Sequence, residues 1–153
     1  MSVSASIDIQ FVQKENDRMS SIAVLQKLIQ FGWTFNDYGL VSYLPIGDND
    51  DYDWQREDIS IDSIMNIISV KEQNRENIGV VLTWKDTDIG GQFLLWNDGN
   101  LSINLTINLK RLEGIDESKN IKITDVNWYF TRLIPAFKGK ELSVESCRYQ
   151  ENV

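Results

Sequence analysis

The stretch IGVVLTWKDTDIGGQFLLWNDGNLSINLTIN, residues 78–108, decides the fold. It contains three runs that are rich in β-branched and apolar residues, and two turn signals separate them. The first turn spans residues 85–91 and contains paired glycines. The second, Asn97-Asp98-Gly99-Asn100, is typical of a hairpin, because Asp-Gly supports the positive φ values that a primed turn needs. We therefore expect three antiparallel strands over residues 78–84, 92–96 and 101–107.

The last of these strands should have two different faces. Its apolar residues are Leu101, Ile103, Leu105 and Ile107, and they alternate with Ser102, Asn104, Thr106 and Asn108. A period of two places alternate side chains on opposite faces of a sheet. One face is therefore expected to be apolar, and the other to carry short polar side chains.

Helical spacing appears on both sides of this meander. The apolar residues Ile22, Leu25, Leu28 and Ile29 predict a helix over residues 19–31, with Asp17 or Ser20 as its N-cap and Gly32 as its stop. A second apolar helical face is formed by Ile61, Ile64, Met65 and Ile68, with Asp58 or Ser60 as the cap. A third helix is expected to carry Val126, Tyr129, Phe130, Leu133 and Phe137. Thr124 or Asp125 would cap that helix, and Pro135 would end or kink it.

Three further strands complete the expected order β-α-β-α-β-β-β-α-β. They are residues 7–11, residues 40–46 and a final strand around Leu142, Val144 and Ser146, with a polar tail from Gln150. Residues 110–122 are predicted to form a charged loop. This order indicates one α+β domain over residues 1–153, a two-layer sandwich. Its mainly antiparallel sheet should have about five to six strands, with about three helices.

The charge of the chain is concentrated in one window. The formal net charge is −8, and residues 48–62 contain seven carboxylates and a single basic residue, Arg56. A net acidic chain repels phosphate backbones, so we expect no direct binding to nucleic acid. A cationic partner is favoured, because opposite fields speed encounter. Plain solubility is the alternative explanation of the charge.

The chain has no histidine and one cysteine, Cys147. Histidine-based triads, histidine general bases and most zinc sites are thereby excluded, as is an intramolecular disulfide. Cys147 is expected to be a buried, inert thiol. We predict no catalytic residue, no cofactor and no metal. The N-terminus MSVSASID lacks the pattern of a secretory signal, and no apolar run approaches the ~20 residues of a membrane helix, so a cytoplasmic location is expected.

The acidic stretch GDNDDYDWQRED, residues 47–58, has three competing interpretations: a metal loop, a solvated loop and a binding surface. A helix-loop-helix calcium site needs Gly at position six and Glu at position twelve. Counting from Asp48 gives Asp53 and Ile59 at these positions, and counting from Asp51 gives Arg56 and Asp62. Neither frame fits, which argues against a specific metal site.

A binding surface is the interpretation that we adopt. Tyr52 and Trp54 stand among carboxylates, and aromatic anchors within a charged rim are typical of binding hot spots. The predicted partner-binding residues are Asp48, Asp50, Asp51, Tyr52, Asp53, Trp54, Glu57 and Asp58. The open alternative is a solvated loop with Trp54 folded back onto the core.

Other carboxylates in the sequence could also form sites. Residues 86–91, DTDIGG, could hold a cation or a sugar hydroxyl, but a tight turn is the simpler interpretation. Carboxylate pairs such as Asp53 with Glu57, or Asp86 with Asp88, could support catalysis only if the fold placed them across a cleft.

Parts of the chain resemble small bacterial immunity proteins of polymorphic toxin systems, such as contact-dependent growth inhibition. These parts are residues 78–96, the NDGN turn at residues 97–100, and the segment TDVNWYFTRLIP at residues 124–135. The resemblance covers about the last half of the chain. It implies a cytosolic, non-enzymatic protein that binds one cognate toxin domain. Many such toxins are basic nucleases, RNases among them. A small carboxylate-based enzyme or ligand-binding domain is the alternative, and a structural subunit of a larger assembly is a third.

Overall fold

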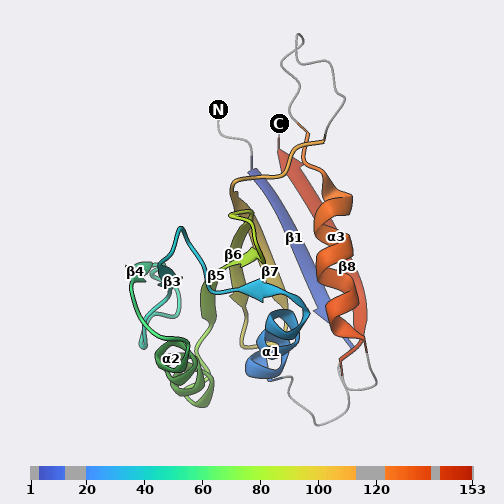
Figure 1. The fold of residues 1–153 in the computed structure, drawn as a ribbon. Coiled ribbons are helices and arrows are strands. Elements are labelled where there is room, and N and C mark those ends of the chain that lie inside the picture. The colour runs from blue at the N-terminus through green and yellow to red at the C-terminus, as the bar shows by residue number, and fades with distance from the viewer. Residues whose placement is uncertain (1–3, 13–19, 113–122, 139–141, 153) are drawn as a thin grey trace.

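The computed structural model describes residues 4–12, 20–112, 123–138 and 142–152 (Figure 1). The first half contains β1 (Ser4–Phe11), α1 (Ser21–Phe31), β2 (Trp33–Thr34), β3 (Val41–Tyr43), β4 (Gln55–Glu57) and α2 (Ile61–Gln73). The second half contains β5 (Ile78–Trp84), β6 (Gly90–Leu95), β7 (Leu101–Ile107), α3 (Val126–Leu133), the 3-10 helix η2 (Ile134–Phe137) and β8 (Val144–Asn152).

The strands form one antiparallel sheet. Its order is β4-β3-β5-β6-β7-β1-β8, and β2 pairs with β5 beside this path. The α+β class, the antiparallel sheet and the two hairpins of residues 78–107 are confirmed. The sheet has eight strands in the described part of the chain, which is more than the five to six expected. The strands from the two ends of the chain, β1 and β8, pair with each other at one edge (Figure 1).

The additional strands are short, and neither has a readable period. β2 has two residues and β4 has three, whereas the alternation of a half-buried strand needs at least four. β4 lies inside the acidic stretch and pairs with β3, so that stretch is partly a sheet edge. The final strand extends further than predicted, because Gln150 and Glu151 of the polar tail pair with Ser6 and Ala5.

The helix ends follow local chemistry. Ser20, Ser60 and Asp125 cap the three helices, each accepting a backbone N–H from three residues along. Gly32 ends α1 with φ 140°, a value that L side chains rarely adopt. Of the two predicted roles of Pro135, ending the helix agrees with the structure: α3 ends at Leu133, and Pro135 is the second residue of η2. Asp17, residue 19 of the first predicted helix and most of the predicted 110–122 loop lie outside the described residues.

The paired glycines belong to a strand, which corrects the predicted turn. Gly90 and Gly91 begin β6, and the turn before them includes Asp86 at φ 61°. A Cβ on Gly90 would lie 2.0 Å from the Leu82 carbonyl oxygen. Only glycine permits this close approach of two backbones, at a point where the β6–β7 register also shifts.

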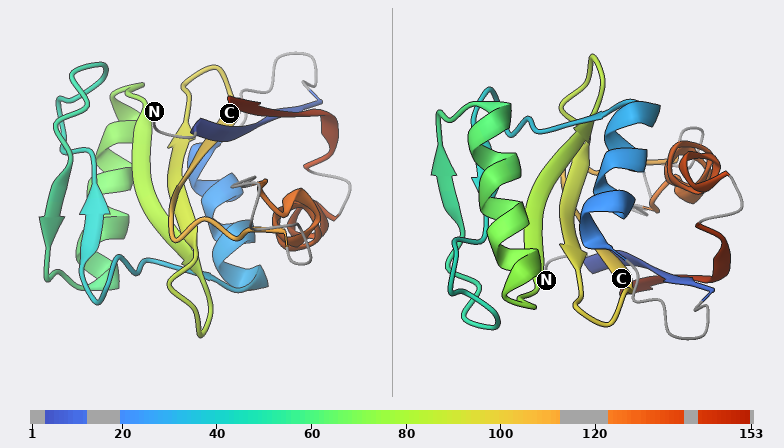
Figure 2. Two further views of the ribbon diagram at one scale, coloured as in Figure 1. Left: turned by 90° about the horizontal axis from the view of Figure 1, so that it is seen from above. Right: turned by 90° about the horizontal axis from the view of Figure 1, so that it is seen from below.

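The core lies between the helices and one face of the sheet. Figure 2 shows the sheet curving around α1 and α3, while α2 lies beside β3 and β5. Ile7, Ile103 and Leu25 are among the buried residues of this layer. Alternation sends Asp8 and Ser102 to the opposite face, which we call the open face, as the sequence of β7 predicts.

Cys147 is exposed on β8, which corrects the prediction of a buried thiol. Partial burial of this thiol and the charge of Asp8 raise its pKa, so little thiolate forms at neutral pH. No helix in the described residues is long and apolar enough to cross a membrane.

Candidate functional site

Asp48 lies inside the acidic loop and organises it. Its side chain is 5% exposed. One carboxylate oxygen accepts the backbone N–H groups of Asp51 and Tyr52 at 3.0 and 3.1 Å, and the other accepts that of Asp53 at 2.7 Å. A buried carboxylate needs such donors, because an unsatisfied charge is costly away from water. Asp48 is therefore removed from the predicted contact surface, since its oxygens are turned inward.

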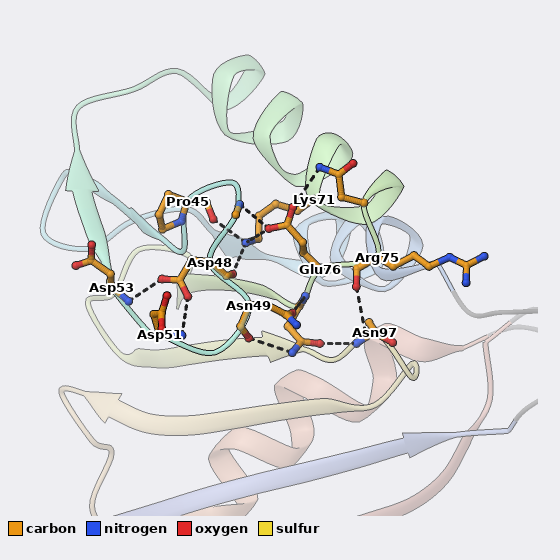
Figure 3. A network of polar contacts seen from close by, with 12 residues as sticks. Pro45, Asp48, Asn49, Asp51, Asp53, Lys71, Arg75, Glu76 and Asn97 are labelled. Carbon is orange, nitrogen blue, oxygen red and sulfur yellow. Dashed lines mark hydrogen bonds and ion pairs between the residues drawn. The ribbon is translucent and has the colours of Figure 1, made fainter.

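Lys71 on α2 also holds the loop in place, and the sequence analysis did not predict this role. Its side chain is 1% exposed, and its ammonium group donates to the carbonyls of Pro45 at 2.8 Å and Asp48 at 2.7 Å (Figure 3). The sequence does contain a signal for this role. Lys71 continues the buried stripe of Ile64 and Ile68 on α2, where a lysine can be buried only with partners.

Glu76, whose side chain is 12% exposed, completes the network around Lys71. Its Oε1 lies 3.4 Å from Lys71 Nζ and accepts the Gly47 N–H at 2.6 Å. Burial alone would raise the pKa of this carboxyl. Hydrogen bonds from Gly47 and Asn74, together with the charge of Lys71, outweigh that effect and leave the pKa below its ordinary value.

Asparagines connect the loop to the neighbouring turn. Asn77 donates two hydrogen bonds to Asn49: its backbone N–H to the side-chain Oδ1 at 2.8 Å, and its side-chain amide to the backbone carbonyl at 3.2 Å. Asn77 also accepts the backbone N–H of Asn97, whose side chain donates to the Arg75 carbonyl (Figure 3). The start of the loop is thus held by α2 and by the segment that follows α2, and that segment is in turn bonded to the β6–β7 turn.

The remaining predicted residues divide into exposed and packed positions. The exposed ones are Asp50, Asp51, Tyr52, Asp53, Glu57 and Asp58. Tyr52 has φ 55°, and its side chain is 45% exposed. Glu57 lies on β4 and accepts the Tyr43 hydroxyl at 2.8 Å. Burial and this carboxylate raise the pKa of Tyr43. The loop therefore presents several carboxylates and one aromatic ring to solvent in a fixed arrangement.

Trp54 is folded back onto the sheet, but on the open face. It is half-buried, and its ring lies where a Cβ on Gly79 would approach within 3.0 Å. The same hypothetical Cβ would lie 2.6 Å from Leu44. Glycine at position 79 therefore leaves room for Leu44 and the indole over β5. The Trp54 side chain therefore forms one side of the space next to the loop, and part of the Trp54 surface stays accessible to solvent.

A groove of about 440 Å³ lies on the open face, next to this wall. Its lining residues are Ser6, Asp8, Tyr52, Trp54, Gln92, Leu94, Trp96, Ser102 and Asn104. Trp96 donates its indole N–H to the Ser102 hydroxyl at 2.8 Å, and that hydroxyl donates to Asp8 Oδ1 at 2.7 Å. The sequence predicted the polar face of β7 but not the groove. The groove forms only where folding brings the acidic loop next to the sheet, and the sequence does not show that contact.

An adjoining pocket of about 270 Å³ shares Asp8, Trp96 and Ser102 with the groove. It adds Asp98 and Arg148, among other residues. Arg148 stands opposite Asp8 in the β1–β8 pairing. The two hollows meet at these shared residues, and the second one extends toward the edge strand β8.

The metal-binding and catalytic alternatives concern the acidic loop and the β5–β6 turn. Among the residues that it describes, no group of three or more histidine, cysteine or acidic side chains could hold a metal ion. In the acidic loop the reason is plain, because the Asp48 oxygens are taken by backbone N–H groups. Asp86 and Asp88 are exposed in the β5–β6 turn, and Asp88 accepts the Asn36 side chain.

Comparisons with protein-family models, with curated proteins and with solved structures gave no significant match.

Proposed function

We propose that this chain is a non-enzymatic immunity protein of a polymorphic toxin system, one that binds and neutralises a cognate basic toxin domain. A nuclease is the favoured class of toxin, and the cytoplasm is the proposed site of action. One observation carries the proposal: the exposed carboxylates Asp50, Asp51 and Asp53 stand on a loop that Asp48 and Lys71 hold rigid from within.

Rigidity matters because binding is weakened by the entropy lost when a loop becomes ordered. This loop is already ordered, so its charges can meet a basic surface without that loss. Tyr52 adds an exposed aromatic ring, which is the kind of side chain that carries binding energy at interfaces. The formal net charge of −8 extends the attraction beyond the loop.

A nuclease would be a suitable target on chemical grounds. Its active site attracts phosphates, and a row of carboxylates can occupy the same positive field. Such an inhibitor needs no catalytic group of its own. The absence of histidine from the sequence is compatible with that requirement.

The test is coexpression of the tagged chain with the product of the adjacent upstream reading frame. We expect that product to be toxic alone, to be harmless with this chain and to copurify with it in a salt-sensitive complex. Replacing Asp50, Asp51 and Asp53 together by asparagine should slow association at least tenfold at low salt and flatten its salt dependence.

The matched control is Asp86→Asn, which removes one exposed carboxylate from the β5–β6 turn. It should leave association close to that of the parent chain. An absence of both complex and toxicity would refute the proposal. A complex that is insensitive to the triple replacement would refute the role of the loop.

A small ligand-binding domain or carboxylate-based enzyme is the second candidate, and the groove favours it. A volume of about 440 Å³ with aromatic walls is within the range of small-molecule sites. Acid–base hydrolysis uses two carboxylates, however, and Asp8 is the one carboxylate among the described residues that line the groove. Saturable binding of a small metabolite, without any protein partner, would favour this candidate.

A further inference from the structure

We infer that the groove on the open face receives an arginine side chain from the partner protein, with the guanidinium group against Asp8 and the tryptophan walls. The inference rests on the proposed function only in taking the occupant to be part of a protein. It concerns a surface that the acidic loop does not include, apart from Tyr52 and Trp54 at its wall.

The charge of the groove is the first support. Asp8 is the one carboxylate among its described lining residues, and no lysine or arginine is among them, while Arg148 lines the adjoining pocket. The ion pairs found within the described residues are Arg56 with Asp37 and Lys71 with Glu76, so none involves Asp8. Arg148 pairs with Asp8 in strand register but does not come within ion-pair distance. A half-buried carboxylate without a cation favours a cationic ligand.

The hydrogen bonds of Asp8 fix how it could receive that ligand. Ser102 donates to Oδ1, and Ser102 is itself held by the Trp96 indole N–H. The carboxylate is thereby positioned beside the Trp96 ring. The described structure gives Oδ2 no hydrogen bond, which leaves it available to a donor in the groove.

The aromatic lining distinguishes arginine from other cations. A guanidinium group is planar, stacks on indole faces and presents several donors in a fixed arrangement, whereas an ammonium group is compact and more strongly hydrated. Trp54, Trp96 and Tyr52 supply the faces, and Gln92 and Asn104 supply amide groups nearby. Leu94, which is 8% exposed, adds a small apolar contact that suits the methylene stem of the side chain.

Position supports a protein as the source of this side chain. Tyr52 belongs both to the exposed surface of the acidic loop and to the wall of the groove. A basic domain that docks on the loop would therefore place its neighbouring side chains over the open face. The groove is also too small for a folded element, but large enough for one long side chain and its water molecules.

The experiment uses the full chain labelled with ¹⁵N, and N-acetyl-L-arginine amide as the probe. The indole N–H signals of Trp54 and Trp96 should shift saturably, with a Kd on the order of millimolar for so small a fragment. N-acetyl-L-citrulline amide, which has a similar shape without the charge, should bind about tenfold more weakly. The lysine analogue should fall between the two.

Two variants separate the groove from general acidity. Asp8→Asn should abolish the preference for arginine over citrulline, and Asp86→Asn should preserve it. The Trp33 indole signal, from a buried ring bonded to the Arg132 carbonyl, reports whether each variant is folded. Equal binding of arginine and citrulline would overturn the inference. Shifts confined to the acidic loop, or tighter binding of a neutral sugar such as methyl glucoside, would also overturn it.

Failure of this inference can be distinguished from failure of the proposed function. If a toxin complex forms and Asp8→Asn leaves its affinity unchanged, the inference is wrong and the proposed function stands. If the groove selects arginine but no toxic partner exists, the proposed function is wrong and the binding site stands.

Discussion

Asp48 and Asp50 are two residues apart in one loop, yet they have opposite environments. Asp48 is 5% exposed and belongs with Lys71 and Glu76 to what we call the inner set. Asp50 is exposed and belongs with Asp51 and Asp53 to the outer set. The inner set is held by short hydrogen bonds to backbone groups, whereas its outer neighbours face solvent.

The comparison shows how one kind of residue can serve structure and recognition in the same segment. A buried charge must be matched by donors or acceptors, so the inner set specifies the path of the loop. An exposed charge contributes little to stability but contributes to the field that a partner meets. The inner set should therefore control folding, and the outer set should control binding.

The largest effect is expected when Lys71 is replaced by alanine. The carbonyls of Pro45 and Asp48 would lose their donor, and Glu76 would lose its cation. Removing one member of a buried charged network costs about 3–5 kcal/mol. Urea unfolding followed by tryptophan fluorescence measures this loss. Lys138→Ala, at an exposed lysine, is the control and should change stability little.

A smaller loss is expected for Asp48→Ala. Three backbone N–H groups would lose their acceptor, but the loop could open and let water replace it. We expect about 2–3 kcal/mol of destabilisation in urea unfolding. Asp50→Ala is the matched control in the same loop. Similar stabilities of the two variants would show that the division into inner and outer sets is wrong.

The pH dependence of stability tests Glu76. Its pKa is lower in the folded chain than the ordinary 4.5, so the folded state favours the charged form. The stabilisation is fully present above the unfolded pKa and is lost as pH falls through the folded pKa. Glu76→Gln should be less stable than the parent chain at pH 7. The difference should shrink steadily as the pH is lowered below 4.5, and a constant difference would contradict the assignment.

These predictions also show what the sequence alone could provide. Alternation in β7, the Asp-Gly turn and the apolar stripes of α1 and α2 are local patterns, and they predicted the antiparallel meander and the helices. The caps Ser20, Ser60 and Asp125 were each one of two predicted residues, because capping depends on a few adjacent residues. Strands β2 and β4 were missed because their pairing with distant strands, and not their own residues, makes them strands.

The candidate site was predicted less completely, for a related reason. The acidic composition of residues 47–58 is visible in the sequence, but the inward position of Asp48 depends on contacts within the folded loop. Lys71 could have been suspected from its place on an apolar helical stripe. The groove could not, because Asp8, Trp54 and Trp96 come from three distant segments that only the folded sheet brings together.

The smallest effect on stability is expected for the outer set. Replacing Asp50, Asp51 and Asp53 together by asparagine removes no backbone hydrogen bond that the structure describes at these side chains. Each change should alter the free energy of unfolding by less than about 0.5 kcal/mol. Because the chain carries a net charge of −8, relief of repulsion should offset part of any loss at low salt.

Urea unfolding at low and high salt measures both effects on this triple variant. Its stability should match that of the parent chain at high salt, where exposed charges are screened. A destabilisation as large as that of Asp48→Ala would mean that the outer carboxylates also hold the loop. The exposure of a carboxylate would then not show whether it serves folding or binding. If the triple variant folds normally but loses its partner, recognition has been separated from folding within a single loop.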